Sequence, residues 1–264
     1  MMLTAYLEGI GLLGPGFANW PNGRAILAGE QPYQPQKTVL PPPALLPAAE
    51  RRRAGAIIKL TLATGMEAIT AAGLDAATLP TVFAASGGDG DTCHAICETL
   101  ATAERHISPT RFHNSVHNAA AGYWSIATHA MTASSVLSAF DASFGAGLLE
   151  AITQVVADDT RTELLACDTP YPEPLHGARP IPDAFGIALV LAPQRGPQAL
   201  AQITVSLTDA TAHRLDDAAL ENLRLTIPAA RGLPVLRTIA RRQDQQVVVD
   251  YLEHTRLNVA VVLC

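Results

Sequence analysis

The sequence of 264 residues is poor in charge, in aromatic side chains and in cysteine. Only 16% of the residues are charged and 5% are aromatic, and the four cysteines are Cys93, Cys97, Cys167 and Cys264. The net charge of −6 argues against a nucleic-acid-binding protein, because such proteins are usually basic. The cysteine spacings do not form a disulfide framework, which fits a reducing compartment.

Long apolar runs are also missing. No uninterrupted apolar stretch reaches the roughly 18 residues that a membrane span needs. The N-terminus has no basic region before its apolar residues, and Glu8 interrupts them. We therefore expect no signal peptide and no membrane insertion, and we expect a cytoplasmic protein. The 48% of hydrophobic residues is enough for a large core.

The order of apolar segments predicts an α/β fold. A helix is expected in 48–73, where Ile58, Leu62, Met66 and Ile69 share one face and Gly73 ends it. The alternation of strands and helices predicts a largely parallel sheet covered by helices. Strands are expected at 3–12, 81–86, 134–140 and 162–167, and helices at 93–102, 115–131 and 144–157.

The remaining segments give a weaker pattern. Residues 30–47 are rich in proline and are expected to form an irregular surface loop. Segments 185–192 and 201–207 are predicted to be adjacent strands, and 245–252 and 257–264 to be closing strands. Residues 215–244 are ambiguous, since Pro228 and Pro234 interrupt their helical pattern.

The segment "SAFDASFGAG", Ser138–Gly147, joins a predicted strand to a predicted helix. Many acyl-transfer enzymes place a serine or cysteine nucleophile on such a sharp turn. Here the tip carries Asp141 instead. Either this carboxylate does chemistry, or it marks a site whose chemistry has been lost.

The segment before the turn, "FHNSVHNAAAGYWSIATHAM", resembles the beta-ketoacyl synthase branch of the thiolase fold. Asn118, Ala121 and Gly122 match the family's Asn-x-x-Ala-Gly helix, and an ungapped count from Gly122 places the catalytic cysteine of the family on Asp141. The resemblance implies a single thiolase-like domain, 1–264. Its ketosynthase N-terminal-like half would be 1–170, and 171–264 would be an abbreviated C-terminal half.

The departures from the family point to a lost activity. The His-Gly-Thr-Gly-Thr motif, the Asn-x-x-x-Gly-His motif and the terminal Gly-Phe-Gly-Gly signature are all missing. The chain therefore resembles the chain-length-factor subunits of ketosynthases, in particular the abbreviated form of aryl-polyene-type pathways. That resemblance implies a heterodimer with an active ketosynthase, a shared tunnel for the growing polyene, and an acyl carrier protein as partner. It implies no cofactor and no metal.

The physical chemistry of Asp141 fits an inactive site. The field at a helix N-terminus is expected to keep the carboxylate ionised, and the carboxylate is expected to accept the helix N–H groups as a cap and so to fill the oxyanion hole. Without paired histidines there is no proton shuttle. Two other hypotheses stay open: an acyl-thioester decarboxylase or hydrolase that uses Asp141 with His113 or His117, and a stand-alone homodimer that binds an acyl or aryl ligand.

Further candidate positions follow from the residues themselves and, for the tunnel and interface, from the same resemblance. Arg51, Arg52 and Arg53 are either a solvated helical turn or a docking patch for the acidic carrier protein or the partner subunit. His113 and His117 have the i, i+4 spacing of a helix and suggest an interface rather than a metal site. Cys93 and Cys97 are expected to be buried thiols. The residues expected at the tunnel or the interface are Phe112, His113, Ser115, Val116, Phe140, Asp141 and Phe144.

Overall fold

The first strand, β1 (Met2–Leu13), lies inside the sheet and is buried along most of its length. It pairs antiparallel with β5 (Phe185–Ala192) on one side and with β6 (Ala201–Thr208) on the other. The prediction that the two later strands are neighbours is therefore wrong. An almost wholly apolar strand is most stable where both of its faces are covered, and β1 takes that place between them.

The computed structural model describes residues 2–264, whose strands form one eight-stranded sheet in the order β3-β2-β4-β5-β1-β6-β8-β7. The sheet is mixed, because β2 pairs parallel with β3 and β4 whereas the other five pairings are antiparallel. The expectation of a largely parallel sheet thus holds only near β2. The remaining strands are β2 (Thr81–Ala84), β3 (Ser134–Leu137), β4 (Thr162–Asp168), β7 (Gln245–Val249) and β8 (Arg256–Leu263).

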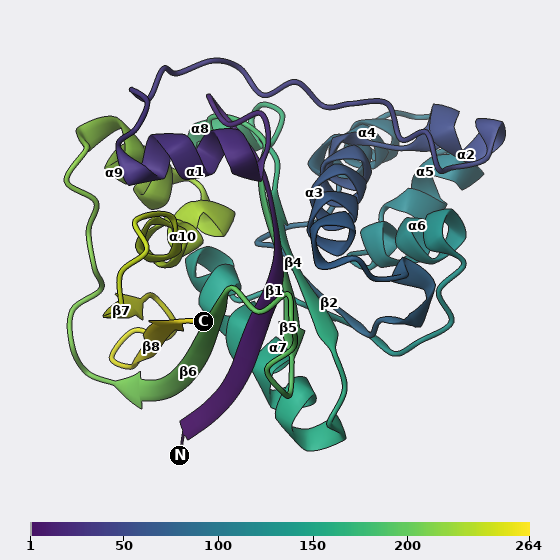
Figure 1. The fold of residues 1–264 in the computed structure, drawn as a ribbon. Coiled ribbons are helices and arrows are strands. Elements are labelled where there is room, and N and C mark those ends of the chain that lie inside the picture. The colour runs from purple at the N-terminus through teal and green to yellow at the C-terminus, as the bar shows by residue number, and fades with distance from the viewer. Residues whose placement is uncertain (1) are drawn as a thin grey trace.

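Helices cover both faces of this sheet (Figure 1). One face carries α3 and α6, and the other carries α1, α7 and α10. None of the helices within residues 2–264 is long and apolar enough to cross a membrane. The helices are α1 (Trp20–Ala28), α2 (Ala48–Arg53), α3 (Ala56–Ala72), α4 (Gly90–Leu100), α5 (Pro109–Asn114), α6 (Ala119–Thr128), α7 (Ser143–Asp158), α8 (Leu175–Ala178), α9 (Ala218–Thr226) and α10 (Leu233–Ala240). Short 3₁₀ turns are η1 (Ala76–Thr78), η2 (Phe140–Ala142) and η3 (Pro228–Gly232).

Several predicted boundaries change in the structure. The helix expected in 48–73 is two helices, α2 and α3, separated by Ala54 and Gly55, and Gly73 ends the second in the left-handed conformation as predicted. The segment 115–131 is helical only from Ala119. In the ambiguous region, η3 starts at Pro228 and α10 has Pro234 in its first turn, so the prolines begin these helices.

Two glycines of β1 allow α3 to pack directly on the strand. A Cβ on Gly11 would lie 1.9 Å from the carbonyl oxygen of Thr64, and one on Gly9 would lie 2.1 Å from that of Ala68. Both contacts are with helix backbone, which has no side-chain rotation to relieve the overlap. The glycines of the first strand are therefore required by packing.

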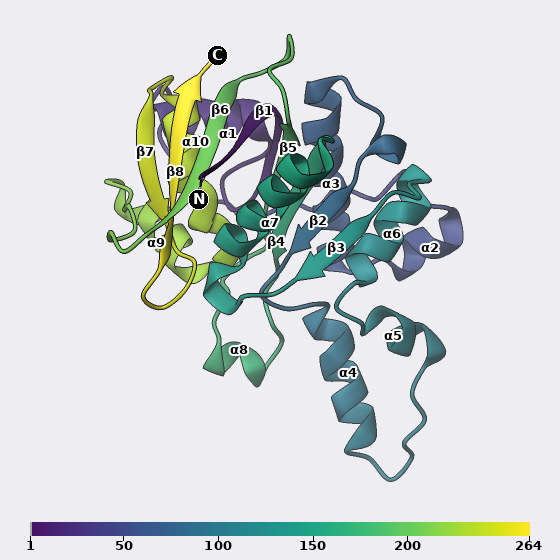
Figure 2. The same ribbon diagram turned by 90° about the horizontal axis from the view of Figure 1, so that it is seen from below.

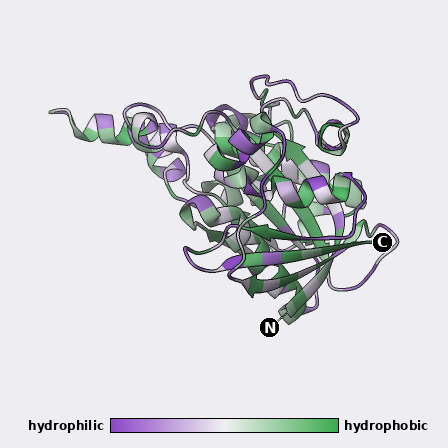
Figure 3. Ribbon diagram, turned by 90° about the vertical axis from the view of Figure 1, so that its left-hand side faces the viewer, coloured by the Kyte–Doolittle hydropathy of each residue, from purple (hydrophilic) through white to green (hydrophobic). Residues whose placement is uncertain are grey.

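The helix α4 projects from the body of the protein (Figure 2). It begins at Gly90, earlier than predicted, because the Asp89 side chain accepts a hydrogen bond from the N–H of Thr92 at 3.0 Å. None of its residues is buried, and Figure 3 shows hydrophilic and hydrophobic residues mixed along it. Cys93 and Cys97 are therefore exposed, contrary to the prediction, because α4 leaves the body of the protein and packs mainly against the short helix α5.

Glu163 is an unpaired carboxyl group in the interior. It lies in β4 between β2 and β5 and has no exposed surface. Neither carboxyl oxygen has a hydrogen-bond partner among the described residues, and burial raises the pKa of this group well above its usual range. Burial therefore favours the neutral form of Glu163 in the folded protein.

We predict that this carboxyl group makes the protein less stable as the pH rises. The native state holds the proton to a higher pH than the unfolded chain does. The free energy of unfolding therefore falls by about 1.4 kcal/mol per pH unit above the unfolded pKa of about 4.3, until the pH reaches the raised pKa of the native state. Urea unfolding across this pH range, compared with the Glu163→Gln variant, measures the effect. Equal slopes in the two proteins would contradict the prediction.

Candidate functional site

The turn between β3 and α7 has the geometry of a strained elbow. Phe140 has a φ of 53°, in the left-handed region that a phenylalanine rarely adopts. The hydroxyl of Ser143 holds the turn, because it donates to the carbonyl oxygen of Phe140 at 2.8 Å and accepts from the N–H of Ala139 at 3.1 Å. The strained residue is thus Phe140, one position before Asp141.

Arg179 occupies the space above this elbow. Its Nη2 donates to Oδ1 of Asp141 at 2.8 Å, and its guanidinium carbon lies 3.7 Å from the centre of the Phe140 ring. The Arg179 side chain is 18% exposed, and the Asp141 side chain is 47% exposed. One arginine therefore makes both an ion pair and a cation–π contact with two successive residues of the elbow.

The structure corrects the expected role of the Asp141 carboxylate. Neither η2 nor α7 has a side-chain cap, so Asp141 does not accept the helix N–H groups. The carboxylate follows Phe140 inside the 3₁₀ turn and is not at the N-cap position of either helix. From there it meets Arg179 instead. Its partner is a guanidinium that stays protonated, and not a histidine that can exchange a proton.

A buried carboxylate, Asp168, ties together the elements around the elbow. Its Oδ1 accepts from the backbone N–H and the hydroxyl of Ser86, at 2.8 and 2.6 Å, and its Oδ2 accepts from the N–H of Ala229 at 2.8 Å. Burial raises the pKa of Asp168, whereas these hydrogen bonds and the charge of Arg179 oppose the rise. Asp168 thus joins the ends of β2 and β4 to η3 and takes no substrate-facing position.

Sequence analysis missed Arg179 and Asp168. Arg179 lies in the segment "LHGARP", three residues after His176. Asp168 directly follows the predicted strand 162–167, and the end of a parallel strand is a usual place for a functional side chain. The position at a strand end could have identified Asp168 as a candidate site residue. No feature of the residues around Arg179 identifies it in the same way.

The predicted tunnel and interface residues fall into two groups, one around the end of α5 and one at the elbow, and they differ in exposure. Phe112, His113 and Val116 are exposed around the end of α5, and Ser115 is half-buried beside them. Phe144 is fully buried in the core, but Phe140 is 64% exposed. His113 and His117 do not share a helix, because α5 ends at Asn114 and His117 lies in the following turn. Their interpretation as i, i+4 neighbours on one helix is wrong.

The arginine triplet in α2 is exposed, but two of its members are already engaged. Arg51 donates to the carbonyl oxygen of Leu46 at 3.0 Å, and Arg53 pairs with Glu50 at 3.3 Å. Arg52 has no ion pair or hydrogen bond to the described residues. The structure is consistent with a solvated helical turn and leaves Arg52 as the arginine most open to a partner.

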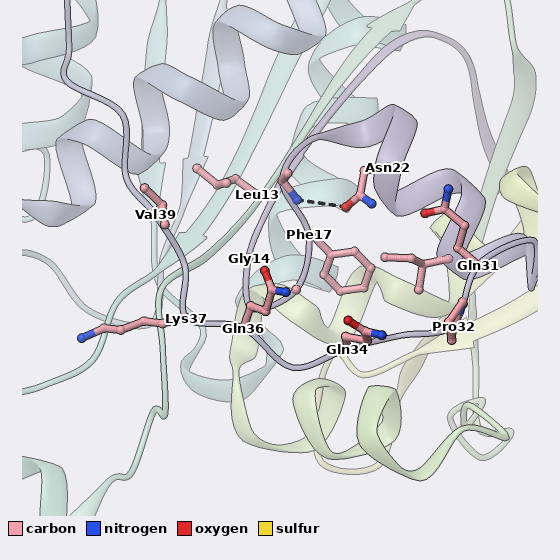
Figure 4. A pocket seen from close by; sticks show the side chains of 13 residues that line it. Leu13, Gly14, Phe17, Asn22, Gln31, Pro32, Gln34, Gln36, Lys37 and Val39 are labelled. Atoms are coloured by element: carbon pink, nitrogen blue, oxygen red, sulfur yellow. Dashed lines mark hydrogen bonds between the residues drawn. The ribbon is translucent and has the colours of Figure 1, made fainter.

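Asp141 does not line any of the five main cavities formed by residues 2–264. A slot of about 20 Å³, between Val116 and the buried Cys167, has room for about one water molecule. Burial raises the pKa of the Cys167 thiol to about 12, so this thiol does not supply a thiolate nucleophile near neutral pH. A groove of about 440 Å³ lies beneath the loop that follows α1, with Phe17 as its floor and Gln34 and Gln36 at its rim (Figure 4).

One edge of the sheet is open beside an apolar surface. The edge strand β3 is paired only with β2 and is half exposed. The start of α6 lines the same small slot as Val136 of β3; on this helix Ile126 is 38% exposed, and Met131, in the loop that leads into β3, is 95% exposed. A strand edge with unpaired backbone groups beside apolar side chains is a usual protein–protein contact.

The sequence profile of the beta-ketoacyl synthase N-terminal domain matches residues 27–254, which is most of the chain. The chain belongs to this family. No curated protein sequence matches it. The expected thiolase-like fold is confirmed, and the turn between its β3 and α7 carries Asp141 and no cysteine.

Several solved structures have the same fold as this chain and match it over nearly its whole length. A chain of the ketosynthase ApeO in complex with its chain length factor ApeC, from Xenorhabdus doucetiae, is 22% identical, with a TM-score of 0.74 and coverage of 98% of this chain and 99% of that one. The ishigamide ketosynthase/chain length factor gives 14% identity, a TM-score of 0.70 and coverage of 98% and 99%. A structure of AntDE with the acyl-carrier protein AntF gives 10% identity, a TM-score of 0.75 and coverage of 100% of both chains.

Proposed function

We propose that this chain is a non-catalytic chain-length-factor subunit. It pairs with an active ketosynthase and shapes the tunnel in which a polyketide or aryl polyene chain grows. The single observation that carries the proposal is the elbow. At the elbow, Phe140 and the Asp141 carboxylate are both in contact with Arg179. A catalytically active member of the family needs an accessible cysteine there.

The chemistry of the elbow supports a role without turnover. A carboxylate paired with a guanidinium is a poor nucleophile toward a thioester, and its product would be a mixed anhydride of higher energy. No histidine hydrogen-bonds to Asp141 among the residues that the structure describes. The alternative of a decarboxylase or hydrolase that uses Asp141 therefore lacks a proton shuttle.

The open edge of the sheet supports a protein partner. Gly122 and Ile126 are four residues apart on α6 and both are exposed, which places them on the same side of the helix. A Cβ on Gly122 would have no atom of residues 2–264 within 4 Å, so packing among these residues does not require the glycine. We infer that it allows close approach of a partner's backbone beside β3.

Two of the solved relatives are complexes or pairs of a ketosynthase with a chain length factor. One further structure contains an acyl-carrier protein bound to its ketosynthase. By analogy we assign a ketosynthase partner to the surface around β3 and α6. A carrier protein is the partner proposed for Arg51, Arg52 and Arg53. Phe112 and Val116 are proposed to limit product length at the interface, and their exposure leaves them available for it.

Co-purification tests the proposed function. The chain, carrying the only affinity tag, is produced together with the ketosynthase encoded nearest to it, and the mass of the eluted species is measured. We expect a one-to-one heterodimer, because the exposed apolar residues around β3 need a partner to cover them. A clean monomer or a homodimer with no ketosynthase bound would contradict the proposal. Binding of an acyl ligand by that homodimer would support the stand-alone binding hypothesis instead.

A further inference from the structure

A second concentration of positive charge lies at the opposite end of the sheet from β3. Three arginines, Arg214, Arg237 and Arg241, line a pocket of about 280 Å³ together with His213 and a single acidic residue, Asp216. The pocket is bounded by the loop before α9, by α10 and by the edge strand β7. The chain as a whole has a net charge of −6, so this local excess of positive charge is opposite in sign to the charge of the whole chain.

The loop that forms one wall of the pocket is held in place by backbone contacts. The N–H of His213 donates to the carbonyl oxygen of Val248 at 2.8 Å, and the N–H of Val248 donates to Nδ1 of His213 at 2.9 Å. The N–H of Leu215 donates to Oε2 of Glu221 at 2.9 Å. These contacts fix both sides of Arg214, so the wall of the pocket is preorganised.

The same contacts define the hydrogen-bonding character of His213. Because Nδ1 accepts a hydrogen bond, the proton of the neutral imidazole lies on Nε2. The ring therefore offers an N–H donor in addition to the guanidinium groups of the pocket. All of these groups are donors, and they suit an acceptor-rich anion.

Asp216 shows that an anion is stabilised at this place. Its carboxylate pairs with Arg237, and its side chain is otherwise 85% exposed. The Arg237 guanidinium holds the pKa of Asp216 below its usual value, and the charge of Arg241 acts in the same direction. Two arginines thus face one exposed carboxylate, and the three arginines exceed the negative charge available inside the pocket.

We propose that this pocket binds a phosphomonoester dianion, with Arg214, Arg237 and Arg241 as its ligands and His213 as an additional donor. The net charge of the pocket residues, with one aspartate against three arginines, matches a dianion better than a single carboxylate. The guanidinium fork matches the geometry of phosphate oxygens. Because β7 and β3 are the two ends of the sheet, a partner that covers β3 leaves the pocket open.

Isothermal titration calorimetry of the full chain at low salt, just above neutral pH, tests this site. Inorganic phosphate and glycerol phosphate are the probes, and glycerol is the control without phosphate. We expect both phosphates to bind and glycerol not to bind. Tighter binding of glycerol phosphate would assign an organic monoester, and tighter binding of inorganic phosphate would assign the free ion. Absence of binding at millimolar phosphate would overturn the proposal.

Matched variants locate the binding. Arg241→Gln is expected to weaken phosphate binding about tenfold or more, the effect of losing one hydrogen bond to a charged group. Arg105→Gln, at an exposed arginine outside the pocket, changes the net charge equally and is expected to leave the affinity unchanged. Asp216→Asn removes the competing carboxylate and should tighten binding several-fold. Equal affinities of Arg241→Gln and Arg105→Gln, or weaker binding by Asp216→Asn, would refute the site.

Discussion

Replacing Ile126 with glutamate is expected to abolish assembly with a ketosynthase and to leave the fold of the chain intact. The side chain is 38% exposed on α6 beside the open edge strand β3, so the isolated chain tolerates a charge there. In the complex the carboxylate would be buried without a partner. Such a group costs about 3 kcal/mol or more, which corresponds to at least a hundredfold loss of affinity.

The measurement is co-elution of the untagged ketosynthase with the tagged variant, followed by size-exclusion chromatography. Leu225→Glu is the matched control, because Leu225 is also an exposed apolar residue of a helix, α9, and is 51% exposed. We expect the Leu225 variant to retain its partner. If both variants bound the ketosynthase equally, the interface would lie elsewhere and the assignment of α6 and β3 to it would be wrong.

A second large effect is expected from Gly11→Ala. The new methyl group would lie 1.9 Å from the carbonyl oxygen of Thr64, and a helix backbone cannot rotate away from it. The strand or α3 must move, and α3 packs across the centre of the sheet. We expect a loss of about 3 kcal/mol or more, a large part of the 5–15 kcal/mol that stabilises a typical domain.

Thermal and urea unfolding measure this loss, and Gly122→Ala provides the comparison. Gly122 lies inside α6 with no atom of this chain near its missing side chain. Alanine is expected to stabilise the isolated chain there by about 0.5–1 kcal/mol, through its higher helix propensity. A Gly11 variant that unfolds at the same temperature as the unsubstituted protein would show that α3 is not held tightly against β1.

Local features of the sequence predicted much of the secondary structure. The periodic placement of Ile58, Leu62 and Ile69 predicted the buried face of α3, and Gly73 predicted its end. The strands that are apolar throughout were recognised because their pattern depends on a few neighbouring residues. The predicted division into halves 1–170 and 171–264 stays a prediction. In the structure, strands of both segments share one sheet, with β1 between β5 and β6.

The errors arose where distant parts of the chain decide the outcome. The order of strands depends on where β1 inserts into the sheet. The residues in and around 185–207 give no signal that β1 lies between β5 and β6. Cys93 and Cys97 were expected to be buried because thiols usually are, but α4 leaves the body of the protein and both thiols stay exposed. Burial is a property of the packed chain, so composition alone predicted it wrongly.

The elbow shows most clearly which features the local sequence determines and which features depend on the tertiary structure. By itself, the sequence determined that a strand-to-helix turn lacks cysteine and carries Asp141, and that the paired histidine motifs of the family are missing. Only the tertiary structure decided that Phe140 is the strained residue and that Arg179 binds Asp141. These two partners are 38 residues apart, and they meet because β4 and the loop after it return to the elbow. A turn is set by its own residues, whereas an ion pair across a loop is set by the packing of the whole sheet.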